Sequence, residues 1–323
     1  MNLVSYCIIL KIMYNFVMIY SYKFHQAKKS VFQYEPKERD INDISRSCEY
    51  DTAYVYYDED TIYKILENKT LWFKHISHFD SVDIYENKAF WSKFTLILDR
   101  KKYSDRFKEL FDEVISDFQN SIKITMPYYV LCASYKEDNW ACWNIFTKKC
   151  SKYGAALGFA KESIKHMFDG KQCFNYGFVV YDDNDKREIF NSILDEMFKI
   201  WHDSDDSDKD IQLKDYFKSV ILEASVMFKS SFYESEKEIR YVINEKYIYE
   251  LADSDWVKKD EELNVYKVTI AKDRFKSLHC TSSLQMIGFN EMIARTKNEK
   301  LRVKPSQIMT AEENFFENIE KEL

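Results

Sequence analysis

Short runs of apolar and β-branched residues alternate along this chain with longer stretches whose apolar residues recur every three or four positions. The short runs are typical of strands, and the periodic stretches are typical of amphipathic helices. Strands are predicted at residues 53–57, 71–73, 128–134, 155–159, 178–181, 236–243, 265–270, 284–287 and 301–303. Helices are predicted at 59–66, 104–118, 185–201, 211–227 and 290–297, with a turn or helix at 140–147 and a capped helix at 310–322.

Strands and helices follow one another without a regular strand–helix–strand repeat. We therefore expect an α+β fold, with a mixed or antiparallel sheet and helices packed on or beside it. One domain is expected over residues 51–308, preceded by an extension and linker at 1–50 and followed by a helix at 309–323. Residues 1–20 are apolar but interrupted by polar side chains, so neither a membrane span nor a signal peptide is expected. Met13 or Met18 is an alternative start.

The composition narrows the class of protein. Hydrophobic residues make up 46% of the 323, which supports a packed core and excludes a chain that is disordered throughout. Only five glycines are present and no glycine-rich phosphate loop occurs, so ATPase, kinase and Rossmann readings are disfavoured. The net charge is −7 and charges of both signs are interspersed, so the chain lacks the excess of positive charge that is typical of proteins that bind duplex DNA. The seven cysteines form no C-x-x-C pair, which predicts free thiols and a cytoplasmic protein.

Metal-binding patterns are weak in this chain. His75 and His78 could share a helical face, but no third ligand is evident. The acidic run at 203–210 lacks the glycine and the terminal glutamate of a calcium loop, so a solvated loop is expected there. Cys142 and Cys150 have no obvious histidine partner. We therefore expect no metal and no Cys–His nucleophile.

Three carboxylates and an arginine lie within seven residues, directly before an apolar segment: Glu234, Glu236, Glu238 and Arg240. Because side chains alternate in an extended chain, the last three are predicted to share one face of a strand. Charged side chains at the start of a buried strand destabilise the fold unless they form ion pairs or take part in a functional site. Two interpretations stay open: a functional site, or an edge strand with solvated charges or a structural Glu–Arg pair.

Aromatic residues in two predicted elements are further candidates for a binding site. Tyr54, Tyr56 and Tyr57 belong to the first strand, and Trp140 and Trp143 belong to the segment after the third. Most aromatic residues in strands belong to the core. Cys132 lies in an apolar strand-like run and is also expected to be a core residue. Tyrosine and tryptophan beside carboxylates would nevertheless suit a slot that stacks a planar ring and holds a ribose.

These segments resemble an uncharacterised bacterial family, domain of unknown function 2971. The resemblance covers roughly residues 51–308 and rests on the order of its motifs. These are Tyr56-Tyr57, Ile65-Leu66-Glu67, Leu71-Trp72, the strand ending in Ser134, Trp143, the glycine-bearing strand at 153–159, Glu236-Lys237-Glu238-Ile239-Arg240, and Leu301 to Ser306. The family's Asn-Asp-Pro after the second strand is missing, and Asp80 or Asp83 stands at that place.

The layout is also similar in outline to the ADP-ribosyltransferase superfamily, with an early aromatic strand, a middle Ser/Tyr strand and a late Glu strand. This resemblance implies an ADP-ribosyltransferase or an NAD glycohydrolase, with NAD as substrate and, for a transferase, a protein or nucleic acid as acceptor. Glu238 would stabilise the cation that develops on the ribose, and Glu236 would orient the acceptor or act as base. Arg240 would hold a phosphate or fix Glu238.

The same resemblance assigns the binding residues. Tyr56 or Tyr57 would contact the ribose, Trp143 would stack on a ring, and Ser134 would lie on the middle strand of the site. A toxin or phage-defence effector would suit such chemistry.

Two readings without catalysis stay open. In one, lysines, arginines and exposed aromatics bind single-stranded nucleic acid in a sensor protein. In the other, the chain is an interaction module whose Glu/Arg stretch is structural.

Overall fold

The computed structural model describes residues 51–78, 98–120, 127–146, 154–252, 254–296, 298 and 300–307. The chain divides into two compact units. One, called here the helical unit, contains described residues 98–120 and 180–231. The other, the sheet unit, contains the remaining described residues. The predicted boundaries at 50 and 308 stay predictions, and the predicted helix at 310–322 lies outside the described residues.

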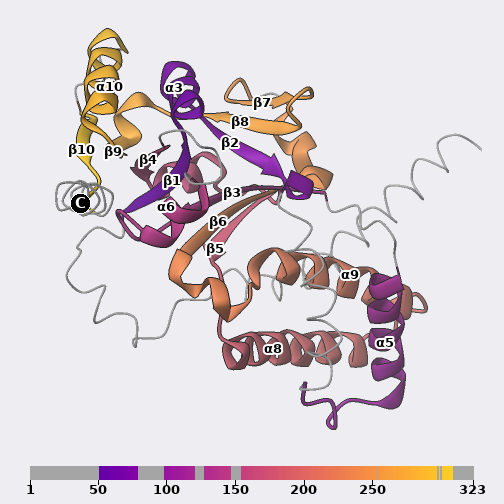
Figure 1. Ribbon diagram of the computed structural model, residues 1–323. Helices are drawn as coiled ribbons and strands as arrows, with labels where there is room; N and C mark the ends of the chain where they lie inside the picture. The colour runs from indigo at the N-terminus through magenta and orange to yellow at the C-terminus, as the bar shows by residue number, and fades with distance from the viewer. Residues whose placement is uncertain are drawn as a thin grey trace, which may run out of the picture. The chain divides into compact units, whose positions relative to one another are not determined.

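The sheet unit is built on a ten-stranded, mostly antiparallel sheet (Figure 1). Eight strands follow the order β10-β9-β4-β1-β3-β2-β8-β7, while β6 pairs with β3 and β5 pairs with β6. The strands are β1 (Thr52–Asp58), β2 (Thr70–His75), β3 (Tyr128–Ser134), β4 (Gly154–Ala160), β5 (Phe174–Phe178), β6 (Glu238–Asn244), β7 (Val257–Asp260), β8 (Val265–Thr269), β9 (Phe275–Cys280) and β10 (Arg302–Pro305). The predicted α+β class with a mixed sheet is confirmed.

Strand β3 is shared by three neighbours. Along one edge it pairs with β6 over its whole length, from Tyr128 to Ser134. On the other edge, β1 pairs with Ser134 at one end and β2 pairs with Tyr129 and Val130 at the other. Strands β1 and β2 therefore meet β3 at opposite ends of one edge. We call this arrangement, over 130–134 of β3, the fork.

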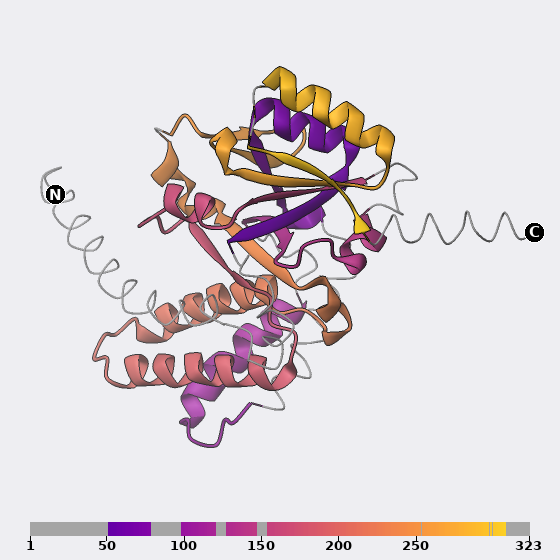
Figure 2. The ribbon, with the colours of Figure 1, turned by 90° about the vertical axis from the view of Figure 1, so that its left-hand side faces the viewer.

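One face of the sheet carries the main apolar core. Helices α3 (Glu59–Asn68) and α10 (Ser283–Thr296) lie side by side over this face (Figure 2). Tyr63 of α3 stacks on Phe289 of α10 with ring centroids 4.6 Å apart. The buried residues of α3 are the three predicted ones, Ile62, Ile65 and Leu66. Asp58 caps this helix by accepting a 2.8 Å hydrogen bond from the Thr61 backbone N–H.

The helical unit packs three helices around aromatic side chains. They are α5 (Asp105–Asn120), α8 (Asp183–His202) and α9 (Lys209–Met227). Phe107 and Phe217 pack with ring centroids 5.3 Å apart, and Phe111 packs on Phe217 at 5.1 Å. The periodicity at 104–118 predicted the buried face of α5 correctly, because a stripe with this spacing must be covered by other helices.

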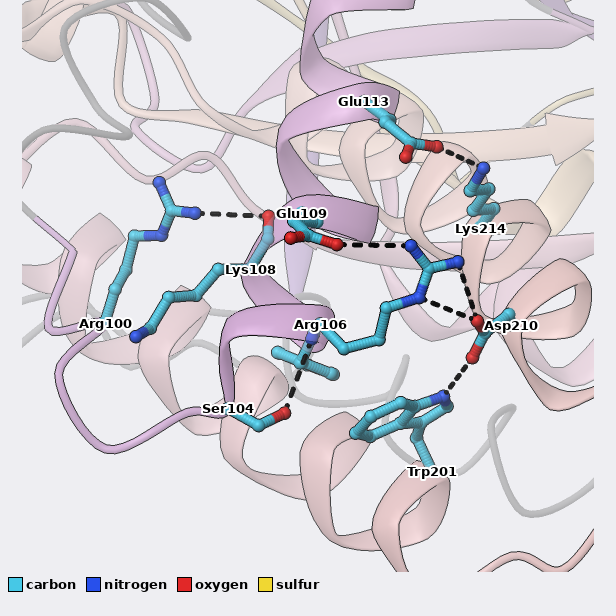
Figure 3. A network of polar contacts seen from close by, with 10 residues as sticks. Arg100, Ser104, Arg106, Lys108, Glu109, Glu113, Trp201, Asp210 and Lys214 are labelled. Atoms are coloured by element: carbon cyan, nitrogen blue, oxygen red, sulfur yellow. Dashed lines mark hydrogen bonds and ion pairs between the residues drawn. The ribbon is translucent and has the colours of Figure 1, made fainter.

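A polar network ties α5 to α9 (Figure 3). Arg106 donates from Nε and Nη2 to Asp210 Oδ2, at 3.0 and 2.9 Å, while Trp201 Nε1 donates to the other oxygen at 2.9 Å. Burial acts to raise the pKa of Asp210, but the bonds from Trp201 and Arg106 outweigh it and the pKa is lowered. Lys214 forms a further ion pair with Glu113.

Short helices complete the described chain. They are α6 (Trp140–Phe146), α7 (Glu162–Met167) and the 3-10 helices η1 (Ile76–His78), η3 (Ser231–Glu236), η4 (Glu245–Leu251) and η5 (Lys272–Arg274). Within the described parts of the chain, no helix is both long and apolar enough to cross a membrane.

Two strand predictions are wrong. Residues 284–287 lie inside α10, because an apolar run of four residues does not distinguish a strand from a helix. The strand predicted at 178–181 is instead β5 at Phe174–Phe178, and Val180 makes a single bridge to Phe228. Helix α7, strands β7 and β9 and the 3-10 helices were not predicted.

Candidate functional site

A pocket of about 160 Å³ lies in the sheet unit at the fork. Its wall comes from the ends of β1, β2 and β3, from α6, and from the chain around the start of β6. The lining residues are Tyr54, Tyr56, Tyr57, Asp58, Lys74, Val130, Cys132, Ala133, Ser134, Cys142, Glu236 and Glu238. Five of the seven predicted site residues therefore line one pocket: Tyr56, Tyr57, Ser134, Glu236 and Glu238.

The two carboxylates reach the pocket from different elements. Glu236 ends η3, Lys237 has a left-handed φ of 49°, and β6 begins at Glu238. The prediction that Glu236, Glu238 and Arg240 share one face of an extended strand is therefore wrong for Glu236. The turn at Lys237 interrupts the alternation of side chains, but both glutamates are buried and both line the pocket.

Glu238 is held by Arg240. The guanidinium donates from Nε to Glu238 Oε1 at 2.9 Å and from Nη2 to Oε2 at 3.1 Å. The two residues are only 5% and 8% exposed, so this pair is a buried, two-pronged ion pair. Arg240 is not among the lining residues. Of its two predicted roles, the geometry matches the fixing of Glu238.

Asn139 joins the elements around the pocket, although the sequence did not single it out. Its Nδ2 lies 2.8 Å from the carbonyl oxygen of Glu236 and 3.1 Å from Ser134 Oγ. Its backbone N–H donates to Tyr56 Oη at 2.8 Å. Its Oδ1 accepts from the Ala141 N–H at 3.0 Å, as an asparagine at a helix N-cap does. An asparagine directly before the predicted segment at 140–147 was the available signal.

Tyr56 and Trp143 pack together behind the pocket. Their rings meet edge to face with centroids 5.1 Å apart, and Trp143 is 1% exposed. Trp143 Nε1 donates to Asp138 Oδ1 at 2.6 Å. Trp143 is thus placed in the packing layer beneath Tyr56, not among the lining residues. Burial raises the pKa of Tyr56 and of Tyr57 well above the usual value, so both phenols stay protonated at neutral pH.

Close packing of β4 positions Tyr54. A Cβ on Gly158 would lie 2.8 Å from Tyr54 Cε1 and 2.7 Å from Ser277 Oγ. Only glycine leaves room for the Tyr54 ring at this point of the sheet. The ring also meets His279 edge to face at 5.9 Å.

The segment from Leu301 to Ser306, the last motif of the family resemblance, contacts the loop that carries Asn139. Ser306 Oγ donates to Asp138 Oδ1 at 2.6 Å, and Lys304 Nζ donates to Glu137 Oε1 at 3.0 Å. His279 Nε2 also lies 2.9 Å from Glu137 Oε1. Residues 304–306 therefore support the pocket through this loop.

Lysine and thiol groups complete the wall. Lys74 Nζ lies 4.7 Å from the centroid of the Tyr57 ring. Cys132, predicted to be core, is half-buried and lines the pocket together with Cys142. Among the described residues, no group of three His, Cys, Asp or Glu side chains could hold a metal ion. Asp80 and Asp83 lie outside the described residues.

Residues 142–241 match the model of a family described as a protein of unknown function, DUF2971. This match confirms the resemblance over the segment that holds Glu236, Glu238 and Arg240. Neither the curated proteins nor the solved structures give a match to the chain. The outline similarity to the ADP-ribosyltransferase superfamily stays a sequence-based prediction.

Proposed function

We propose that the pocket at the fork binds the nicotinamide and the adjoining ribose of NAD, and that the protein cleaves the bond between these two groups. The observation that carries this proposal is the convergence of two buried carboxylates with tyrosine side chains in one pocket. A carboxylate fixed beside a ribose stabilises the positive charge that develops when the glycosidic bond breaks. NAD-consuming toxins and phage-defence effectors need this chemistry.

The bond between the ribose C1′ and the nicotinamide nitrogen breaks, and its electron pair leaves with nicotinamide. Glu238 faces the resulting cation, with its orientation fixed by Arg240. Water, or a nucleophile on a protein or nucleic acid, then forms the new bond at C1′. Glu236 takes the proton that the nucleophile loses.

The size of the pocket limits what it encloses. Pockets that bury a drug-sized ligand are roughly 300–1,000 Å³, and this one is about 160 Å³. It would take the nicotinamide mononucleotide half of NAD at most and leave the adenosine half outside. Tyr54, Tyr56 and Tyr57 supply the aromatic wall for the nicotinamide ring.

The test is the release of nicotinamide from NAD by the purified protein, followed by chromatography. Glu238→Gln keeps the size of the side chain but removes its charge, and it should lower the rate by about 10²–10³-fold. Glu234→Gln is the matched control, because Glu234 is outside the pocket wall and pairs with Lys237. No release by the wild type, or equal rates in all three proteins, would contradict the proposal.

A second function is a pocket that binds a ligand without reaction. The observation in its favour is the buried ion pair itself, since Arg240 Nε and Nη2 both bond Glu238. Under this reading, Glu238→Gln lowers the free energy of unfolding, and neither protein releases nicotinamide. Because the pair is buried, Glu238→Gln should lose stability under both readings, so the nicotinamide assay separates the two functions and chemical denaturation shows that the variant folds.

A further inference from the structure

We propose that Lys74 binds the phosphate of the nicotinamide mononucleotide half of the substrate, an inference that rests on the proposed function. The pyridinium and ribose lie toward Glu236 and Glu238, and the phosphate lies toward Lys74.

Arg240 is poorly placed for this role, although the sequence suggested it. Two of its donors bond Glu238, and the side chain is outside the pocket wall. A phosphate bound by Arg240 would have to displace a buried carboxylate, which leaves that charge without compensation. Among the described residues that line the pocket, the positively charged one is Lys74.

The strand register places Lys74 at a suitable distance. Lys74 is opposite Val130 on β3, and Glu238 is opposite Ser134 on the same strand. Residues that pair directly share a face of the sheet, and Val130 and Ser134, an even number apart, share one too. Four residues of β3 span about 13 Å. Because β2 and β6 lie on opposite edges of β3, Lys74 and Glu238 stand at opposite ends of the pocket, which leaves room for a ribose and its phosphate between their side chains.

The charges along the pocket match this ligand. The carboxylates of Glu236 and Glu238 stand at the end where the pyridinium cation would lie. The ammonium of Lys74 stands at the other end, over the Tyr57 ring, where a phosphate would gain a charge-assisted hydrogen bond. Tyr57 supports the ammonium from below by a cation–π contact.

Asp58 also lines the pocket and would repel a phosphate if its carboxylate faced it. Its two oxygens are engaged by the helix that it caps: Oδ1 accepts from the Thr61 N–H at 2.8 Å and Oδ2 from Thr61 Oγ1 at 3.0 Å. These bonds direct the charge of Asp58 toward the N-terminus of α3. Lys74 therefore keeps the more favourable position for an anion.

The experiment compares nicotinamide mononucleotide with nicotinamide riboside, which lacks the phosphate, by isothermal titration calorimetry. Wild-type protein should bind the mononucleotide more tightly. Lys74→Gln should weaken mononucleotide binding by about 10–100-fold, the effect of one hydrogen bond to a charged group. It should leave riboside binding unchanged. Lys64→Gln, a change on the exposed side of α3, is the matched control and should alter neither affinity.

Three outcomes overturn the inference: the two ligands bind wild-type protein equally, neither binds, or Lys74→Gln weakens both alike. Thermal denaturation of Lys74→Gln shows that the variant folds. Failure of phosphate recognition by Lys74 and failure of the proposed reaction give different results. Phosphate discrimination by Lys74 without nicotinamide release supports this inference alone, whereas release that is indifferent to Lys74 supports only the reaction.

Discussion

The buried pair of Glu238 and Arg240 is the residue-scale feature on which the pocket depends most. Arg240→Met should lower the free energy of unfolding by about 3–5 kcal/mol, because it removes the guanidinium that pairs with the buried Glu238 charge. Arg295→Met is the control. Arg295 is exposed and forms an i,i+4 pair with Glu291, so its loss should cost less than about 0.5 kcal/mol.

Urea denaturation of both variants measures the difference. Equal stability of Arg240→Met and wild type would contradict the account of the pair. The double variant Arg240→Met/Glu238→Gln should recover part of the loss, since it also removes the buried Glu238 charge.

His279 gives the sheet unit a pH-dependent stability. Burial lowers the pKa of His279, although Glu137 and Asp138 act to raise it, and Lys304 lowers it further. In the unfolded chain the histidine titrates near its ordinary value of about 6.5. As the pH falls below that value, the unfolded state binds a proton that the folded state does not, so stability falls.

Denaturation midpoints between pH 5 and 8 measure this effect. His279→Gln should flatten the fall in stability on the acid side, and it keeps a polar group beside Glu137 and the Tyr54 ring. His202→Gln, at an exposed histidine of α8, should leave the slope of the wild type. An identical pH profile for wild type and His279→Gln would be the contrary result.

At the scale of elements, β4 must approach β9 and the Tyr54 ring closely. Gly158→Ala places a Cβ within 2.8 Å of both Ser277 Oγ and Tyr54 Cε1. The crowding should lower stability by about 1–3 kcal/mol and shift the Tyr54 ring, so mononucleotide binding weakens. Gly170→Ala is the matched control. Its φ of 73° strains an alanine, but no atom lies within 4 Å of the added Cβ.

Calorimetry and urea denaturation of the two variants test this prediction. Gly170→Ala should lose stability while its affinity for the mononucleotide is unchanged. A Gly158→Ala protein that binds the ligand as the wild type does would show that the Tyr54 ring is not positioned by β4.

Elements with a strong local pattern could be predicted, and those defined by distant partners could not. Strand β3 was predicted to the residue, because seven consecutive apolar or small residues suit a strand with neighbours on both edges. Strand β7 was missed because Val-Lys-Lys-Asp is an edge strand whose polar side chains carry no alternation signal.

The candidate site shows the same limit. Glu236, Glu238, Tyr56, Tyr57 and Ser134 could be named from residue types and motif order. The left-handed turn at Lys237 and the fork could not be predicted from the sequence pattern. The fork depends on pairing between strands about 55 and about 80 residues apart, which the local sequence does not encode. Lys74 was overlooked for that reason, since only the register places it on the face of Glu238.

At the scale of the whole molecule, the chain forms two compact units and passes between them several times. We expect native-state hydrogen exchange to reveal two sets of protected amides, one in α5 and α9 and one in β3 and β6. Their opening free energies should differ by more than about 1 kcal/mol, as separate cooperative units do. Convergence of the slowest amides of both units on one free energy would contradict this expectation.

A crystal structure of the Glu238→Gln protein with NAD tests the proposed reaction most directly, because this variant should bind the substrate and cleave it about 10²–10³-fold more slowly. We expect the nicotinamide and its ribose in the pocket between β1 and β3, with the ribose beside residue 238 and the adjacent phosphate beside Lys74. An empty pocket at saturating NAD, or NAD bound elsewhere on the protein, would contradict the proposed reaction.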